Sequence, residues 1–208
     1  MRFFFYHFYH RLAWTYDSVA AIVSVGRWND WITTVLPHIQ GTRLLELGYG
    51  TGYLQCSLFR LDLHAFGLDE SRPMGLIARR RLSKAGFQQA NLTRGLAQTL
   101  PFPAQTFDTI VATFPPEFIF EKRTLSEARR VLRHGGRLIV VPAAWILSQK
   151  IIDRSAAWLF TITGQAPAAP YNVLRERIES PFEQAGFKTD FQLVEVKSSL
   201  VMVLIART

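Results

Sequence analysis

Short apolar runs alternate with helical patterns along most of the chain. Leu54, Leu58 and Leu61 recur at three- and four-residue intervals, which is typical of one face of an amphipathic helix. Similar patterns predict helices at about 19–36, 51–61, 71–81, 125–132 and 172–186. The apolar runs predict strands at residues 43–47, 64–69, 91–94, 107–114, 137–141, 187–196 and 200–206.

Strands and helices that alternate in this way predict an α/β fold. We expect a doubly wound, mostly parallel sheet of seven strands with helices on both faces. The last two strands are joined only by Lys197 and Ser198, so they should form a hairpin that adds an antiparallel C-terminal strand. Ser71 and Pro73 are suited to begin a helix, and the "HGG" at 134–136 is suited to end one.

The length of 208 residues fits one domain, and we expect a single unit over 1–208. Its parts would be an N-terminal helical cap at 1–40, the sheet core at 41–142, an apolar helical insert at 143–170, and a C-terminal helix and hairpin at 171–208. The apolar block at 138–164 contains Pro142, Lys150, Asp153 and Arg154. These residues divide it into a strand and an amphipathic helix rather than one membrane span.

Composition and charge narrow the classes of partner. Hydrophobic residues make up 49% of the chain, which predicts a folded protein, and the net charge of +8 favours nucleic acid or an anionic membrane surface as the partner.

The single cysteine, Cys56, excludes an internal disulfide and a metal site built from cysteines. His7, His10 and Arg11 interrupt the aromatic N-terminal run, so it does not match a signal peptide. We therefore expect a cytoplasmic protein without a metal.

The stretch "LLELGYGTG" at 44–52 places three glycines directly after a predicted strand. In open parallel sheets, the first turn from strand to helix is where the backbone comes closest to a ligand. Glycine suits such a turn because it has no Cβ and adopts positive φ readily. The dinucleotide pattern needs a glycine where this chain has Tyr53, and no Gly-Lys-Ser/Thr follows as in a phosphate-binding P-loop.

With its further landmarks, the chain resembles the class I S-adenosylmethionine-dependent methyltransferases. After "LLELGYGTG" come "GLDES", "LPFPAQTFDTIVATF", "LSEARRVLRHGGRLIVV" and "EQAGF", in the order of that family. The combination is similar to the branch that contains the ubiquinone and menaquinone biosynthesis C-methyltransferases. The resemblance implies a Rossmann-like fold, S-adenosyl-L-methionine as cofactor and S-adenosyl-L-homocysteine as product.

The resemblance also implies which residues bind the cofactor. Glu46 and the glycine turn would contact its methionine part, Asp69 would accept hydrogen bonds from both ribose hydroxyls, and Tyr16 would cover it. Asp69 could equally cap the helix that begins near Ser71, and Met74 could flank the adenine or lie in the core. The full implied set is Tyr16, Glu46, Gly48, Tyr49, Gly50, Gly52, Asp69, Glu70, Met74, Leu96, Ala97, Gln98, Thr113, Phe114 and Pro115.

The chain departs from the family at one position. Leu96 stands where the family commonly has an acidic residue that reaches the adenine amino group, and a leucine side chain cannot accept that hydrogen bond. The backbone of Leu96 and Ala97, or the amide of Gln98, would have to replace it. Phe114 similarly replaces the polar residue of the signature found in amino-group methyltransferases, so "FPPE" does not predict that chemistry.

Methyl transfer from a sulfonium is an in-line displacement, and alignment of the reactants can lower its barrier by about 7–11 kcal/mol. A base is needed only for a weakly acidic hydroxyl or carbon acceptor. The candidates are His7, His10 and Tyr16 near the N-terminus, and Glu117 after the fourth strand. Each also has a structural explanation: the histidines as parts of an aromatic helix and Glu117 as a solvated loop acid.

The acceptor is inferred from the two parts that lie outside the shared sheet. The N-terminal segment and the insert are rich in aromatic and apolar residues, which favours a small lipophilic substrate and peripheral contact with a membrane surface. The same residues could instead pack on each other as a cap. There are two alternatives: an RNA- or protein-directed methyltransferase, and a non-catalytic S-adenosylmethionine-binding module. Nucleic acid is the less favoured partner, because the protein's clustered basic residues are not accompanied by aromatic side chains on which bases could stack.

Overall fold

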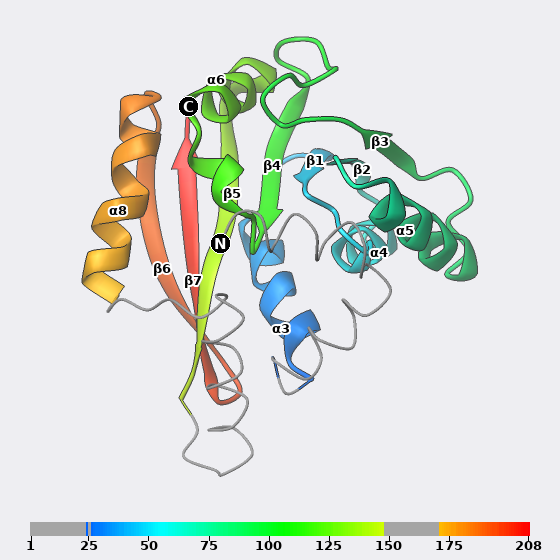
Figure 1. Ribbon diagram of the computed structural model, residues 1–208, viewed down its shortest axis with the longest axis horizontal. Coiled ribbons are helices and arrows are strands. Elements are labelled where there is room, and N and C mark those ends of the chain that lie inside the picture. The colour runs from blue at the N-terminus through cyan, green and yellow to red at the C-terminus, as the bar shows by residue number, and fades with distance from the viewer. Residues whose placement is uncertain (1–23, 25, 148–170) are drawn as a thin grey trace.

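A seven-stranded sheet forms the centre of the protein, as the computed structural model in Figure 1 shows. The structure describes residue 24 and residues 26–147 and 171–208. The strands lie in the order β3-β2-β1-β4-β5-β7-β6. β7 is antiparallel to both of its neighbours, and the pairs among β1 to β5 are parallel. This confirms the predicted fold class, including the antiparallel C-terminal strand.

The elements follow one another as alternating strands and helices. The strands are β1 (Arg43–Leu47), β2 (His64–Asp69), β3 (Asn91–Arg94), β4 (Phe107–Thr113), β5 (Leu132–Ile146), β6 (Lys188–Val196) and β7 (Ser199–Arg207). The α-helices are α3 (Trp28–Ile32), α4 (Tyr53–Arg60), α5 (Arg72–Lys84), α6 (Lys122–Val131) and α8 (Tyr171–Gln184). Two 3-10 helices, η2 (Thr33–His38) and η3 (Glu117–Phe120), complete the described part.

Helices cover both faces of the sheet, because successive side chains of a buried strand point to opposite sides. On one face, α6 and α8 contribute Leu125, Ala128, Ile178 and Phe182 to a core that includes the strand residue Leu45. On the other face, Trp31, Val35, Leu54 and Leu58 of α3, η2 and α4 pack on strand residues such as Leu44. α5 packs against α4 and β3 at the β3 edge.

β5 is longer than the pattern of apolar residues predicts. We expected a helix that ends at 134–136, a strand at 137–141 and a helical insert from 143 onward, but α6 ends at Val131 and β5 runs from Leu132 to Ile146. Leu132 pairs with Phe107, and a register shift follows where the "HGG" lies inside the strand. Residues 143–146 pair with β7 as Ala143↔Met202 through Ile146↔Ser199, so these four residues belong to a strand and not to the expected helical insert. Residues 148–170 lie outside the described part.

The sheet topology places the carboxyl ends of β1, β2 and β4 side by side. β1 lies between β2 and β4, and the strand order reverses direction at the β1–β4 pair. Open α/β sheets bind ligands at such a switch point. The glycine turn after β1, Asp69 at the end of β2 and Thr113 at the end of β4 are therefore brought together by the topology.

Candidate functional site

A pocket lies at the switch point of the sheet. Four elements line it: the end of β1, the start of α4 with the turn before it, the end of β4, and α3. Its lining residues are Trp28, Ile32, Glu46, Gly48, Tyr49, Gly50, Thr51, Tyr53, Leu54 and Thr113. Of the predicted residues, Glu46, Gly48, Tyr49, Gly50 and Thr113 line this pocket, whereas Gly52 and Asp69 do not, and α3 adds two apolar side chains to it.

Each glycine of the turn is required for a different reason, although all three have positive φ (73°, 51° and 83°). The Gly48 N–H donates to the Leu68 carbonyl at 2.7 Å, which holds the turn against β2. A Cβ on Gly52 would lie 2.9 Å from the Cβ of Ala78, so this glycine allows α4 and α5 to approach. A Cβ on Gly50 would meet no atom within 4 Å.

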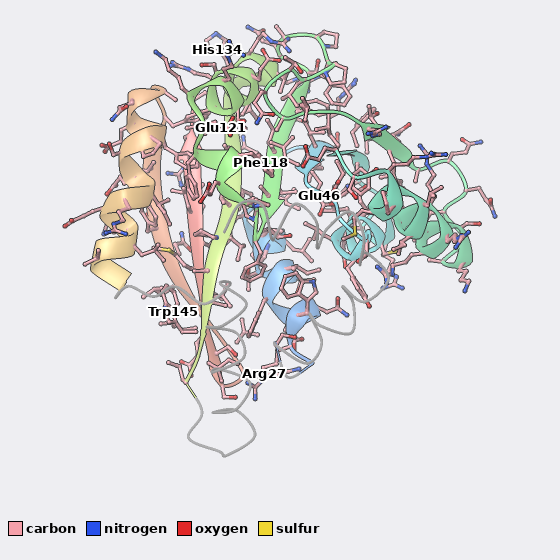
Figure 2. The ribbon with its side chains drawn as sticks, viewed as in Figure 1. Arg27, Glu46, Phe118, Glu121, His134 and Trp145 are labelled. Carbon is pink, nitrogen blue, oxygen red and sulfur yellow. The ribbon has the colours of Figure 1, made fainter. Side chains whose placement is uncertain are left out.

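The backbone beside Gly50 has room for a ligand. The nearest atom to a Cβ on Gly48 would be in the ring of Phe118, at 3.7 Å, and the space beside Gly50 is open. Phe118 belongs to η3 and is labelled with Glu46 in Figure 2. The Phe118 ring thus fills the space beside Gly48, and the open space against the main chain lies beside Gly50.

Asp69 organises the turn from the end of β2. Its Oδ2 accepts the Gly50 N–H at 2.8 Å, and its Oδ1 accepts the Ser71 N–H at 2.8 Å. The N-cap of α5 is Ser71, whose Oγ accepts the Met74 N–H at 3.4 Å. Asp69 thus links the glycine turn to the start of α5 and does not cap that helix itself.

Glu46 is a buried acid on the pocket wall. Its side chain is 2% exposed, and its Oε2 accepts a hydrogen bond of 2.8 Å from Nε2 of Gln55 on α4. Burial is the main cause that raises the Glu46 pKa to about 8; the Gln55 bond lowers it and the charge of Asp69 raises it. A carboxylate without a nearby cation is costly in such surroundings.

Tyr49 contributes its backbone to the turn, while its ring lies in the core. The side chain is 5% exposed and packs with Cys56, Ala78 and Leu82. Gly67 and Gly75 make room for it, since a Cβ on either would lie within 3 Å of a Tyr49 atom. Burial, followed by the charge of Asp69, raises the pKa of Tyr49 to about 12.

The residues implied for the ribose and adenine lie around the end of β2 and the loop after β3. Met74 is 1% exposed and belongs to the core of α5, and Glu70 is exposed. Leu96 is 51% exposed, which is unusual for a leucine, whereas Ala97 is buried. Gln98 donates from Nε2 to Oε2 of Glu121 at 2.8 Å, which ties this loop to the start of α6.

An aromatic group lies at the end of β4. Phe114 has a left-handed backbone (φ 47°), and its N–H donates to the Val141 carbonyl at 2.7 Å. Its ring lies 4.8 Å from Trp28 and 6.0 Å from Trp31, centroid to centroid. The strained backbone is therefore held by β5 and α3. Pro115 follows and is half-buried.

The predicted base candidates are only partly described. Glu117 is exposed at the start of η3. His7, His10 and Tyr16 lie outside the described residues, so their proposed roles stay predictions. Within the described part, no group of three or more His, Cys, Asp or Glu side chains could hold a metal ion. In the same residues, no helix has both the length and the apolar character to cross a membrane.

Seven residues around the site were not predicted from the sequence: Trp28, Ile32, Thr51, Tyr53, Leu54, Gln55 and Phe118. The helical spacing of Trp28, Trp31 and Ile32 could have indicated a buried face, but not which pocket it lines. Gln55 occupies a fully buried helix position that carries no recognisable motif. Phe118 belongs to the 3-10 helix η3, and the sequence carries no signal that its ring would lie beside Gly48.

Comparisons with known proteins agree with this geometry. A family model described as a methyltransferase domain matches residues 45–140. The chain is 29% identical over 219 positions to a demethylmenaquinone methyltransferase of Symbiobacterium thermophilum, covering 89% of this chain and 86% of that protein. It is 31% identical over 199 positions to a ubiquinone/menaquinone biosynthesis C-methyltransferase of Rhizobium meliloti, covering 86% and 76%.

A solved structure shares the fold over nearly the whole chain. A SAM-dependent methyltransferase from Aquifex aeolicus superposes with a TM-score of 0.63 at 16% identity, covering 92% of this chain and 97% of that one. At this identity, the likeness supports the architecture alone.

Proposed function

Since the chain belongs to the S-adenosylmethionine-dependent methyltransferases of the ubiquinone and menaquinone biosynthesis type, we propose that its acceptor is a small lipophilic molecule with a quinone-type ring. The names of the relatives support this acceptor class. The observation that carries it here is the aromatic and apolar wall of the pocket, formed by Trp28 and Ile32 of α3 beside Phe114. An apolar ring would be desolvated there at little cost.

S-adenosylmethionine supplies a methyl group activated by the positive charge on its sulfur. We assign its methionine part to the turn at Gly48 and Gly50, with Glu46 as partner of the ammonium group. Asp69 is assigned to the ribose. Each of its oxygens accepts one backbone N–H, and a carboxylate oxygen has a second lone pair that can accept a hydroxyl. Asp69 can therefore hold the turn and the ribose at once.

The adenine is assigned to the loop after β3. Leu96 exposes half of its side chain, which provides an apolar face for the ring in place of the acidic partner that the family commonly has. Because Gln98 is bonded to Glu121, the loop is held in place by α6. Backbone groups of Leu96 and Ala97 would supply the polar contacts.

The acceptor side is assigned to the end of β4. Thr113 lines the pocket, and Phe114 with Trp28 would exclude water from the path of the methyl group. Fixing both reactants in line can supply about 7–11 kcal/mol of the barrier. A carbon acceptor must also lose a proton, for which Glu117 at the start of η3 is the described candidate and His10 and Tyr16 are the others.

We also propose peripheral contact with a membrane surface, where a lipophilic acceptor would be found. The net charge of +8 supports it, because anionic lipid headgroups attract basic surfaces.

The proposed function is tested with methyl-labelled cofactor. The purified chain is incubated with it and with separate lipid, RNA and protein fractions of a bacterial extract, and with a demethylated quinol. We expect label in the lipid fraction and in the quinol. Label found only in RNA or protein would contradict the lipophilic acceptor and indicate an RNA- or protein-directed methyltransferase. Cofactor binding without methyl transfer to any fraction would indicate a non-catalytic binding module.

A further inference from the structure

Gln55 and Glu46 form a buried polar pair behind the pocket wall. Gln55 is 0% exposed and Glu46 is 2% exposed. Besides its bond to Glu46, Nε2 of Gln55 donates to the Phe66 carbonyl at 3.3 Å. The Gln55 amide therefore connects the Glu46 carboxyl to the backbone of β2. Its Oε1 is buried and has no hydrogen-bond partner among the described residues. An unpaired buried acceptor is costly to a fold, which favours a role for the pair in binding.

Among the described residues, Gln55 and Asp69 shift the Glu46 pKa, and neither is a cation; Arg81 of α5 stacks over Tyr53, which lines the same pocket. Asp69 at the end of β2 is an acid, and the Tyr49 hydroxyl and the Cys56 thiol also face Glu46 electrostatically. α3 and β4 present only Trp28, Ile32 and Thr113 to this pocket. Burial raises the Glu46 pKa to about 8, so the acid carries its proton at neutral pH before a ligand enters. A ligand's ammonium group would supply a cation at this position.

We propose that Gln55 is a positioning residue that fixes the Glu46 carboxyl on the pocket wall, and that entry of the cofactor's ammonium group drives the Glu46 proton into solvent. The inference rests on the proposed function, because it takes the methionine end of S-adenosylmethionine as the cation. The Glu46 O–H bond breaks, a solvent base takes the proton, and the carboxylate pairs with the ammonium. One positive charge enters as another leaves, so the net charge beside Asp69 stays the same.

Calorimetry of S-adenosylmethionine binding tests the proton release directly. Titrations from pH 6 to 9, in two buffers with different ionisation enthalpies, count the protons released by the wild type and by Glu46→Gln. The ligand's own amino group titrates near pH 8, so the difference between the two proteins is the informative quantity. At pH 7 the wild type should release about one proton more than Glu46→Gln. Its affinity should also fall by up to about tenfold per pH unit below pH 8, beyond any change in the variant.

Gln55→Met tests the positioning role, because methionine keeps the volume and removes the amide. Without the Gln55 bond, which lowers the Glu46 pKa, the pH profile of binding should move to higher pH. Affinity at pH 7 should drop at least about tenfold, and the loss should shrink at pH 9. The matched control is Gln184→Met, which changes an exposed glutamine at the end of α8 and should leave the profile unchanged.

The outcomes separate this inference from the function on which it rests. Equal proton release by the wild type and Glu46→Gln, or an unmoved profile in Gln55→Met, would overturn the inference while cofactor binding stands. No binding by the wild type at any pH would overturn the proposed function and the inference together. Glu46→Gln removes the titratable proton and keeps the size and shape of the side chain, so the proton count remains decisive even if Gln55→Met does not fold.

Discussion

Glu46 makes the stability of the cofactor-free protein depend on pH. Its pKa is about 8 in the folded chain against an ordinary 4.5, so between these values the folded state binds more protons than the unfolded state. Stability therefore falls as pH rises through this window. We expect the free energy of unfolding of Glu46→Gln to lack this dependence on pH. Relative to wild type, the variant should therefore become more stable by about 2–4 kcal/mol between pH 5 and pH 9. Urea unfolding of both proteins at pH 5 and pH 9 measures this change. A stability difference between them that is the same at both pH values would contradict the prediction.

Asp69 combines a structural and a binding role, and substitution can separate them. Asp69→Asn replaces one carboxylate oxygen by an N–H₂ group that faces a backbone donor, so one of the two bonds to Gly50 and Ser71 is lost. We expect a loss of about 1–3 kcal/mol in stability and of at least about tenfold in S-adenosylmethionine affinity. Chemical unfolding and calorimetry measure the two effects.

Ser71→Ala is the matched control for Asp69→Asn. It removes the side-chain cap of α5, which costs about 0.5–2 kcal/mol, but keeps the Ser71 N–H that Asp69 accepts. Its cofactor affinity should stay close to that of wild type. An equal loss of affinity in both variants would assign the effect to the start of α5 and not to the Asp69 carboxylate.

The turn between β1 and α4 serves packing and binding at different glycines. A Cβ on Gly52 would press on Ala78 of α5, whereas a Cβ on Gly50 would enter open space beside the pocket. We expect Gly52→Ala to lower stability by about 2–4 kcal/mol, through overpacking and the positive φ. Gly50→Ala should lower the free energy of unfolding by only about 1 kcal/mol. Its loss of S-adenosylmethionine affinity should be larger than this small loss of stability accounts for. Thermal unfolding and calorimetry on both variants test this, and the reverse pattern would refute it.

The ends of the elements show what local sequence can predict. β1, β2 and β3 match the expected residues 43–47, 64–69 and 91–94, because each is a short segment between turn residues. β5 does not match, because its extra residues are strand only through their pairing with Phe107 and β7. That pairing is a tertiary contact, and the glycines at 135 and 136 locally favour a helix end.

At the scale of the whole molecule, the site also contains some features that local sequence predicts and others that depend on tertiary contacts. Motifs and family order could indicate that the glycine turn, Asp69 and Thr113 lie near one another, since parallel strands bring their carboxyl ends together; of these, Gly48, Gly50 and Thr113 line the pocket. The Gln55–Glu46 pair, the Phe118 ring beside Gly48 and the burial of the Tyr49 ring could not be predicted in this way. They depend on which side chains meet after α4, α5 and η3 have packed, and no spacing in the sequence encodes that packing.

The distribution of basic residues over the two edges of the sheet decides how the protein meets an anionic surface. α5, on the β3 edge, carries five basic residues and no acidic ones. Arg79 donates to the Leu92 carbonyl and Arg81 stacks over Tyr53 at 3.6 Å. The exposed basic residues Arg80 and Lys84 remain on the outer face of α5. α8 and β6 lie at the opposite side of the molecule, as Figure 1 shows.

We therefore expect the chain to bind vesicles that contain anionic lipid, and to do so through α5. Arg80→Glu with Lys84→Glu should weaken binding at least about tenfold, since each basic residue near such a surface contributes about 1 kcal/mol, and added salt should weaken the wild type similarly. Arg177→Glu with Lys188→Glu makes the same charge change on α8 and β6 and should have a smaller effect. Co-sedimentation with anionic and neutral vesicles measures the difference. Equal weakening by both double variants would mean that net charge, and not the α5 face, determines contact with the membrane.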